Sequence, residues 1–375
     1  MQKAIALLVI SSLFLSAVNA GKPCYVLAIQ GGTTQAAYTA GAIQGLVKNL
    51  PAGQAAYDVV TGSGSSGITA ALAALYPKGQ EAAMAQNIVN FWQSLQPHDL
   101  WKNWLTGIIQ GLLAEPGLYN TAPAVTFFSK IFKSPPNGRY FSMGTTNAND
   151  ATYWLFNNFN GPMNADAFNA AIRATWATPG IIPYVNYGSQ TLVDGSILKN
   201  LDIAAGVIQC RAINGKDDSN IFVDTILLHE KTWSADVTEH THTIKMLQLT
   251  LKLTSQKATM YDIEKAKWDF PNVNFRYTVA PSQKLPTNSH PYDFTAKEKA
   301  FMINLGLSDA ARSISAGPGV MWADYSNHVS QYLRSTHGPN AMLKRDEEHA
   351  KLVQALKKAF AEELAREKAN QTIQE

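Results

Sequence analysis

The feature that most limits the possible folds is an alternation of short apolar runs with helical patterns. An apolar run at 24–29 (CYVLAI) precedes a helical pattern at 36–50, and a second run at 57–61 (YDVVT) precedes a second pattern at 67–76. This alternation is typical of a mainly parallel sheet flanked by helices. Further strands are predicted at 140–146, 191–194, 221–228 and 275–280, and further helices at 80–95, 100–113, 166–177, 240–265 and 296–315. No internal repeat or low-complexity linker is present, which favours one large α/β domain.

The second strand-to-helix junction contains the run Gly62-Ser63-Gly64-Ser65-Ser66-Gly67. This run matches the glycine fingerprint of a dinucleotide-binding turn, which requires a following strand that ends in an acidic residue about 20 residues on. That strand is missing, because the apolar residues of 83–92 have helical spacing and Glu81 begins that helix. We therefore expect no nucleotide cofactor.

The same run also fits a serine elbow, the sharp strand-to-helix turn that presents a nucleophile in esterases. Ser65 has that position in the frame Ser63-Gly64-Ser65-Ser66-Gly67. Two other segments supply possible partners. The amides of Gly31 and Gly32, between a strand and a helix, can hold an oxyanion, and the carboxylate of Asp194 at a strand end can accept the serine proton.

With these motifs the chain resembles the patatin-like phospholipases. The motifs that carry the resemblance are Gln30-Gly31-Gly32 with Gly41, the segment Ala174 to Pro183, Asp194-Gly195-Ser196 with Asn200, and the segment 290–310. The resemblance covers roughly residues 24–312. It implies a three-layer α/β/α fold with a mainly parallel central sheet, and a Ser-Asp dyad that needs no histidine, metal or other cofactor.

The sequence departs from the family pattern at two places. Thr33 and Gln35 stand where members usually carry a third loop glycine and an arginine. The elbow also permits two alignments. Without a gap, the nucleophile position falls on Gly64, where no acyl-enzyme can form; with a shift of one residue it falls on Ser65, with Gly67 as the second flanking glycine.

Two functions follow from the two alignments. In the shifted alignment, which we prefer here, Ser65 attacks a lipid ester, Asp194 accepts its proton, and Gly31 and Gly32 stabilise the oxyanion. The protein is then a lipid acyl hydrolase of the phospholipase A or esterase type. In the unshifted alignment it keeps the fold for lipid binding, storage or protein contact. Nucleic acid is not an expected ligand, because the net charge is only +3.

The N-terminus predicts a protein that is secreted or lies in the lumen of the secretory pathway. Lys3 precedes an apolar stretch, and Val18-Asn19-Ala20 provides small residues for cleavage after Ala20. Cys24 and Cys210 either form a disulfide in an oxidising compartment or remain buried thiols. We expect a signal peptide at 1–20, a patatin-like domain at 21–315 and a C-terminal helical extension at 316–375.

A predicted helix beginning at Trp101 carries apolar residues at helical spacing up to Leu112. Such a stripe packs against a core more commonly than it meets lipid. As a functional element, it would touch a membrane surface through Trp101 and Trp104.

Overall fold

The computed structural model describes residues 22–32, 35–215, 217–231, 243–288 and 290–337. The predicted signal peptide and most of the predicted C-terminal extension lie outside these residues. The chain divides into two compact units, Met1–Ser326 and Asn327–Glu375. The predicted domain boundaries at residues 20 and 315 stay predictions.

The described strands form one eight-stranded sheet in the order β5-β6-β3-β2-β1-β7-β8, with β4 also paired to β3. Their bounds are β1 Cys24–Ile29, β2 Val59–Ser63, β3 Tyr140–Asn147, β4 Thr152–Asn157, β5 Val185–Tyr187, β6 Gln190–Asp194, β7 Ile221–Ile226 and β8 Asn274–Val279. The pairs around β1 and β2 are parallel, whereas β4, β5 and β6 pair in antiparallel fashion. The predicted mainly parallel sheet is confirmed.

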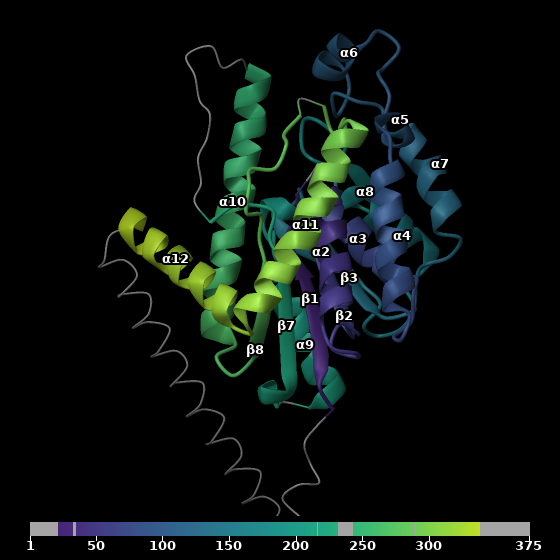
Figure 1. Cartoon of the computed structure of the whole chain (residues 1–375). Coiled ribbons are helices and arrows are strands. Elements are labelled where there is room, and N and C mark those ends of the chain that lie inside the picture. The colour runs from purple at the N-terminus through teal and green to yellow at the C-terminus, as the bar shows by residue number, and fades with distance from the viewer. Residues whose placement is uncertain (1–21, 33–34, 216, 232–242, 289, 338–375) are drawn as a thin grey trace, which may run out of the picture. The chain divides into compact units, whose positions relative to one another are not determined.

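Helices cover both faces of this sheet (Figure 1). Their bounds are α2 Ala36–Asn49, α3 Ser65–Ala73, α4 Glu81–Ser94, α5 Pro97–Leu100, α6 Ile108–Leu113, α7 Ala122–Ile131, α8 Ala165–Ala174, α9 Ile203–Asn214, α10 Thr243–Asp269, α11 Ala296–Ala316 and α12 Val320–His337, with short 3-10 turns at Gly195–Ile197 and Asp218–Asn220. Among the described helices, none combines the length and the apolar composition that crossing a membrane requires.

The central strand β1 is buried on both faces, as its continuous apolar run predicts. Leu27 and Ile29 belong to the main core with residues of α2, α3 and α11. Val26 points to the opposite face, where Gly206 of α9 lies so close that any side chain there would overlap with it. The predicted three-layer α/β/α arrangement is therefore confirmed.

The prediction of one helix over 100–113 is wrong. The chain is extended at Trp101 and has a positive φ of 78° at Gly107, so that only α5 and the six-residue α6 form. The apolar spacing of this segment resembles one helical stripe, but a glycine with that backbone conformation interrupts it.

The structure joins Cys24 to Cys210 by a disulfide, with the two Cα atoms 5.7 Å apart. The bond links the first residue of β1 to α9, and it selects the first of the two interpretations that the sequence leaves open.

Candidate active site

The turn between β2 and α3 has the geometry of a strand-to-helix elbow. Gly64 lies between them with φ 60° and ψ −143°, a conformation that residues with side chains rarely adopt. A side chain at Gly62 would overlap with the carbonyl oxygen of Ser66, because α3 folds directly back over the strand. The residue at the point of this elbow is Gly64.

The space beside Gly64 is where a nucleophile would stand. A Cβ added there would lie 3.4 Å from the amide nitrogen of Gly32 and 3.6 Å from Oδ1 of Asp194. Both are ordinary van der Waals distances, so the space has room for a side chain, but the φ of 60° strains the backbone of any residue other than glycine at this position. The local geometry therefore corresponds to the unshifted alignment, in which glycine has the nucleophile position.

Ser65 is the first residue of α3, and its hydroxyl points elsewhere. The Oγ atom is buried and donates a hydrogen bond to the carbonyl oxygen of Gly32. Among the described residues, no hydrogen bond joins Ser65 to Asp194. The predicted dyad partners thus lie in the same region but are not paired.

Asp194 reaches the elbow because of strand register. Ser63 at the end of β2 pairs with Gly144 of β3, and Asp194 at the end of β6 pairs with the next residue, Thr145. A side chain at Gly195 would overlap with the backbone of Gly144, so the turn after Asp194 requires glycine. The ends of β2 and β6 consequently lie on either side of β3, at neighbouring residues of that strand.

The Asp194 carboxylate is buried, and no cationic side chain pairs with it among the residues that the structure describes. Oδ1 accepts a hydrogen bond from the Ser196 amide at 2.9 Å, and Oδ2 accepts one from Thr178 Oγ1 at 3.3 Å. Burial raises the pKa of Asp194 to about 6, and these hydrogen bonds oppose the shift only in part. The carboxyl group therefore titrates two pH units closer to neutrality than an exposed aspartate.

The two predicted oxyanion glycines differ in availability. The Gly31 amide donates to the backbone carbonyl of Asn200 at 2.8 Å, so it is not free to bind an oxyanion. Asn200 is itself fixed, because its amide donates to Asp262 at 2.8 Å. The Gly32 amide has no hydrogen-bond partner among the described residues, and it is the donor that faces the space beside Gly64.

Gly67, the predicted second elbow glycine, serves packing. A side chain there would overlap with Thr175 Oγ1, which lies within hydrogen-bonding distance of the carbonyl oxygens of Gly144 (2.9 Å) and Gly64 (3.3 Å). Thr175 therefore holds the elbow backbone against β3. It was not predicted as a site residue, although it lies within the motif segment 174–183.

Tyr292 covers the elbow. Its side chain is 3% exposed and lies between the rings of Trp92 and Trp176, with centroid distances of 6.0 and 5.9 Å. Burial raises the pKa of Tyr292 well above its usual value, and the nearby charge of Asp194 raises it further. Its φ of 61° is a strained conformation for a bulky residue. The segment 290–310 that contains Tyr292 carries part of the family resemblance, but the sequence predicts no role for Tyr292 itself.

Comparison with known proteins agrees with this geometry. The sequence pattern of the family described as "Patatin-like phospholipase" matches residues 27–206, which include the glycine loop, the elbow and Asp194. Residues 27–206 are a patatin-like phospholipase domain. No curated protein sequence matches the chain.

Two solved structures were also found. The crystal structure of VipD from Legionella pneumophila has a TM-score of 0.38 and 10% identity, over 80% of this chain and 68% of that chain. The crystal structure of the type III effector protein ExoU has a TM-score of 0.32 and 12% identity, over 91% of this chain and 65% of that chain. Scores of this size carry no inference about function.

The structure of the patatin-like domain thus brings three of the predicted site features together. The Gly32 amide and the Asp194 carboxylate both lie beside Gly64 at the elbow, and Asp194 and Tyr292 are buried. The residue from which a nucleophile would project there is Gly64.

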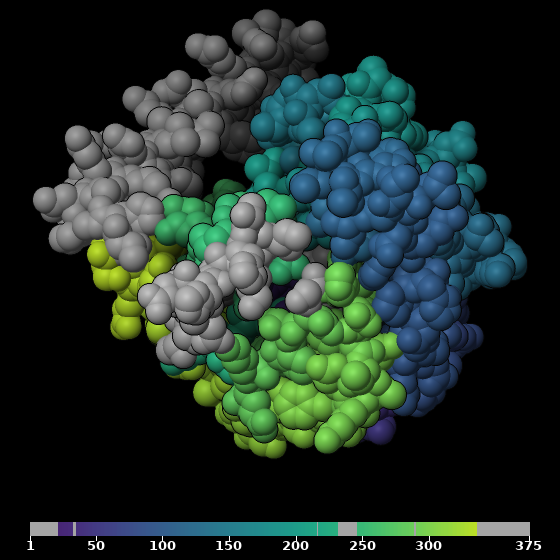
Figure 2. All heavy atoms as spheres, turned by 90° about the horizontal axis from the view of Figure 1, so that it is seen from above, coloured from purple at the N-terminus to yellow at the C-terminus, as the bar shows by residue number. Residues whose placement is uncertain are grey.

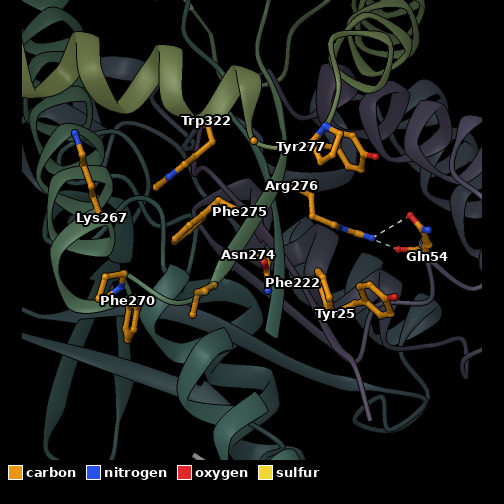
Figure 3. Close-up of a pocket in the computed structure, with 14 residues that line it drawn as sticks. Tyr25, Gln54, Phe222, Lys267, Phe270, Asn274, Phe275, Arg276, Tyr277 and Trp322 are labelled. Carbon is orange, nitrogen blue, oxygen red and sulfur yellow. Dashed lines mark hydrogen bonds between the residues drawn. The ribbon is translucent and has the colours of Figure 1, made fainter. Parts of the chain in front are cut away.

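A separate pocket of about 790 Å³ lies at the opposite end of the sheet, where β1, β7 and β8 begin (Figure 3). The guanidinium group of Arg276 lies over the ring of Tyr25 and donates to Gln54 and to the buried carboxylate of Asp224. None of the residues at the elbow lines this pocket.

Proposed function

We propose that the patatin-like domain binds a lipid acyl ester at the elbow and does not form an acyl-enzyme there. The observation that carries this proposal is Gly64 at the point of the elbow, since glycine has no atom that can attack a carbonyl carbon. The domain's family supports a lipid as the ligand. Glycine at the point of the elbow corresponds to the unshifted alignment, whereas the sequence favours the shifted one.

The remaining groups support binding of an uncharged ester. The Gly32 amide can donate to the ester carbonyl, and the Ser65 and Ser66 amides at the start of α3 are among the first amides of a helix, which have no acceptor within it. Asp194 is ionised above pH 6 and would repel a free fatty acid carboxylate. An intact ester is therefore a better ligand than the product of its hydrolysis.

Hydrolysis through Ser65 is the second candidate, because its hydroxyl lies one residue from the elbow and contacts the glycine loop. In this scheme Ser65 Oγ leaves the Gly32 carbonyl and attacks the ester carbon, while Asp194 takes the hydroxyl proton. The Gly32 amide stabilises the oxyanion, and Asp194 gives the proton to the alcohol that leaves as the ester C–O bond breaks. Water then releases the acyl group from Ser65 as a fatty acid. The scheme requires Ser65 to rotate from the position it has here.

Fluorophosphonate labelling distinguishes the two candidates. The probe phosphonylates activated serines, and mass spectrometry locates the modified peptide. We expect no label on the folded protein, and we expect the protein to retain intact ester after incubation with phospholipid. A label that disappears in Ser65→Ala, together with release of more fatty acid than protein present, would contradict the proposal and support hydrolysis.

We also propose that the protein enters the secretory pathway. The apolar N-terminal stretch and the Cys24–Cys210 disulfide support this proposal. N-terminal sequencing of the protein recovered from the medium of secreting cells is expected to begin at Gly21. Retention inside the cell with residues 1–20 intact would contradict it.

A further inference from the structure

A short excursion between α5 and α7 carries exposed aliphatic side chains. An antiparallel bridge between Lys102 and Asn120 closes its base, with both backbone hydrogen bonds at 2.9 Å. The helix α6 forms its tip, at the upper end of the molecule in Figure 1. The strands β1 and β2 point toward the same end, and so does the elbow that follows β2.

The excursion is a defined structure and not a loose loop. The Trp104 indole donates to the carbonyl oxygen of Gly117 at 3.0 Å, across the base. Gly111 of α6 lies against the backbone of Leu118, where a Cβ would approach the carbonyl oxygen to 2.5 Å. Trp104 and Gly111 thus face the inside of the excursion, and the aliphatic side chains face outward.

Four side chains, which we call the apolar tip, are unusually exposed. They are Leu105 (98%), Ile109 (69%), Leu112 (67%) and Leu113 (78%). No charged residue occurs between Lys102 and Glu115. A protein surface rarely leaves a group of large aliphatic side chains in water unless it meets a partner or a lipid surface.

The size and charge of the apolar tip favour lipid over protein. Four aliphatic side chains can bury on the order of 400 Å² of apolar surface. A stable protein interface needs about 800 Å² from each partner, with charged and polar groups at its rim. A projecting uncharged tip offers neither, whereas insertion into a bilayer surface needs only exposed apolar groups.

The excursion is also bonded to the segment that covers the elbow. The Trp101 indole donates to the carbonyl oxygen of Pro291 at 2.9 Å, next to Tyr292. Tyr119 Oη lies 2.6 Å from Nδ1 of His290. Viewed from this end, the blue atoms that include the excursion lie beside the green atoms that include the cover (Figure 2). The two tryptophans are thus held in the protein, and the aliphatic residues beyond them are exposed.

We propose that Leu105, Ile109, Leu112 and Leu113 insert into a lipid surface and hold the covered elbow against it. The purpose of this contact rests on the proposed function, because a lipid ester would reach the elbow from the lipid surface. The insertion itself is independent of what the elbow does. It differs from the predicted contact through Trp101 and Trp104, whose indole groups are already bonded.

Vesicle sedimentation tests the apolar tip. The variant Leu112→Gln/Leu113→Gln is compared with the wild type and with Ile208→Gln/Ile213→Gln, a control pair on α9 with exposures of 58% and 42%. On neutral phosphatidylcholine vesicles, we expect the tip variant to bind at least tenfold more weakly and the control pair within twofold of the wild type. Binding is expected to persist at high salt, because no charges are involved.

Several results would overturn the proposal. The first is that the tip variant binds the vesicles as tightly as the wild type does, and the second is that the folded wild type does not bind them. The third is that the wild type forms a dimer and the tip variant does not. The elbow is tested separately by uptake of a phospholipid dispersed in detergent. Loss of vesicle binding with retained uptake supports the apolar tip and leaves the elbow proposal standing, whereas retained vesicle binding without uptake contradicts only the elbow proposal.

Discussion

At the scale of single residues, the buried Asp194 gives the main support for the proposal that the elbow binds a ligand. Its carboxylate is 2% exposed and bonded only to uncharged groups among the described residues. Burying a carboxylate in this way opposes folding whenever the group is ionised. If position 194 had a purely structural role, an uncharged residue there would stabilise the fold as well as aspartate does, or better.

Asp194→Asn is therefore predicted to stabilise the protein at neutral pH. The pKa rises from 3.8 to about 6 on folding, which corresponds to roughly 3 kcal/mol at 1.36 kcal/mol for each pH unit. The folded protein holds its proton more tightly, so the wild type loses stability as the pH rises from about 4 to 6, and the variant does not. Urea unfolding at pH 4 and pH 7 measures the difference.

The expected result is near-equal stability at pH 4 and a gain of up to roughly 3 kcal/mol for the variant at pH 7. Asp217→Asn is the control, since Asp217 is exposed and hydrogen bonds lower its pKa. A variant that is less stable than the wild type at pH 7 would show that Asp194 supports the fold.

The sequence predicted the residues of the site better than their roles. The positions of Asp194 and the glycine loop followed from strand ends, which meet at one edge of a sheet. Whether Gly64 or Ser65 stands at the point of the elbow depends on the backbone conformation of a single residue. The same run of glycine and serine residues fits both alignments, so only the φ of 60° at Gly64 distinguishes them.

At the scale of elements, the site depends on a close contact between α2 and α11. Gly41 lies against the backbone of Ile303, and Gly306 lies against the backbone of Tyr38. The sequence analysis identified Gly41 as part of the family pattern but could not identify the helix it contacts, which begins some 255 residues later in the chain. Contacts between such distant segments leave no periodic signal.

Gly41→Ala is predicted to lower the free energy of unfolding by about 2 kcal/mol. The added methyl group would overlap with the Ile303 carbonyl oxygen, and the resulting helix displacement costs more than alanine's better helix propensity returns. Lys48→Ala, on the exposed side of α2, is expected to change stability by less than about 0.5 kcal/mol. Thermal unfolding that ranks the two variants equally would contradict the packing described here.

The segment that precedes α7 shows another limit of sequence patterns. The spacing from Trp101 to Leu112 fits a helix with an apolar face, and such a face usually packs on a core. The backbone turn at Gly107 and the indole hydrogen bonds of Trp101 and Trp104 reverse this expectation. The tryptophans point inward, and the aliphatic residues are exposed.

At the scale of the whole molecule, the disulfide between Cys24 and Cys210 closes a long covalent loop. Cys24 and Cys210 are 186 residues apart and enclose the elbow, the glycine loop and Asp194. In the chain-entropy account, closing a loop of this length stabilises the folded state by about 5 kcal/mol, although measured effects are often smaller.

The double variant Cys24→Ala/Cys210→Ala is predicted to lose about 2–5 kcal/mol of unfolding free energy. Both side chains are small and buried, so their replacement by alanine leaves little empty space. Urea unfolding of the wild type with and without reductant provides the matched comparison. Identical unfolding in all three samples would mean that the bond contributes nothing to stability.

The central claim is that the elbow is intact except for the missing nucleophile at Gly64. Its most direct test is fluorophosphonate labelling of Gly64→Ser, because a Cβ there meets no atom closer than 3.4 Å and lies 3.6 Å from Oδ1 of Asp194. The φ of 60° strains a serine at this position, so the fold of the variant is checked first. We predict a label at position 64 in this variant, greatly reduced labelling in Gly64→Ser/Asp194→Asn, and none in the wild type. A folded Gly64→Ser variant that stays unlabelled, or a wild type labelled on Ser65, would contradict the account.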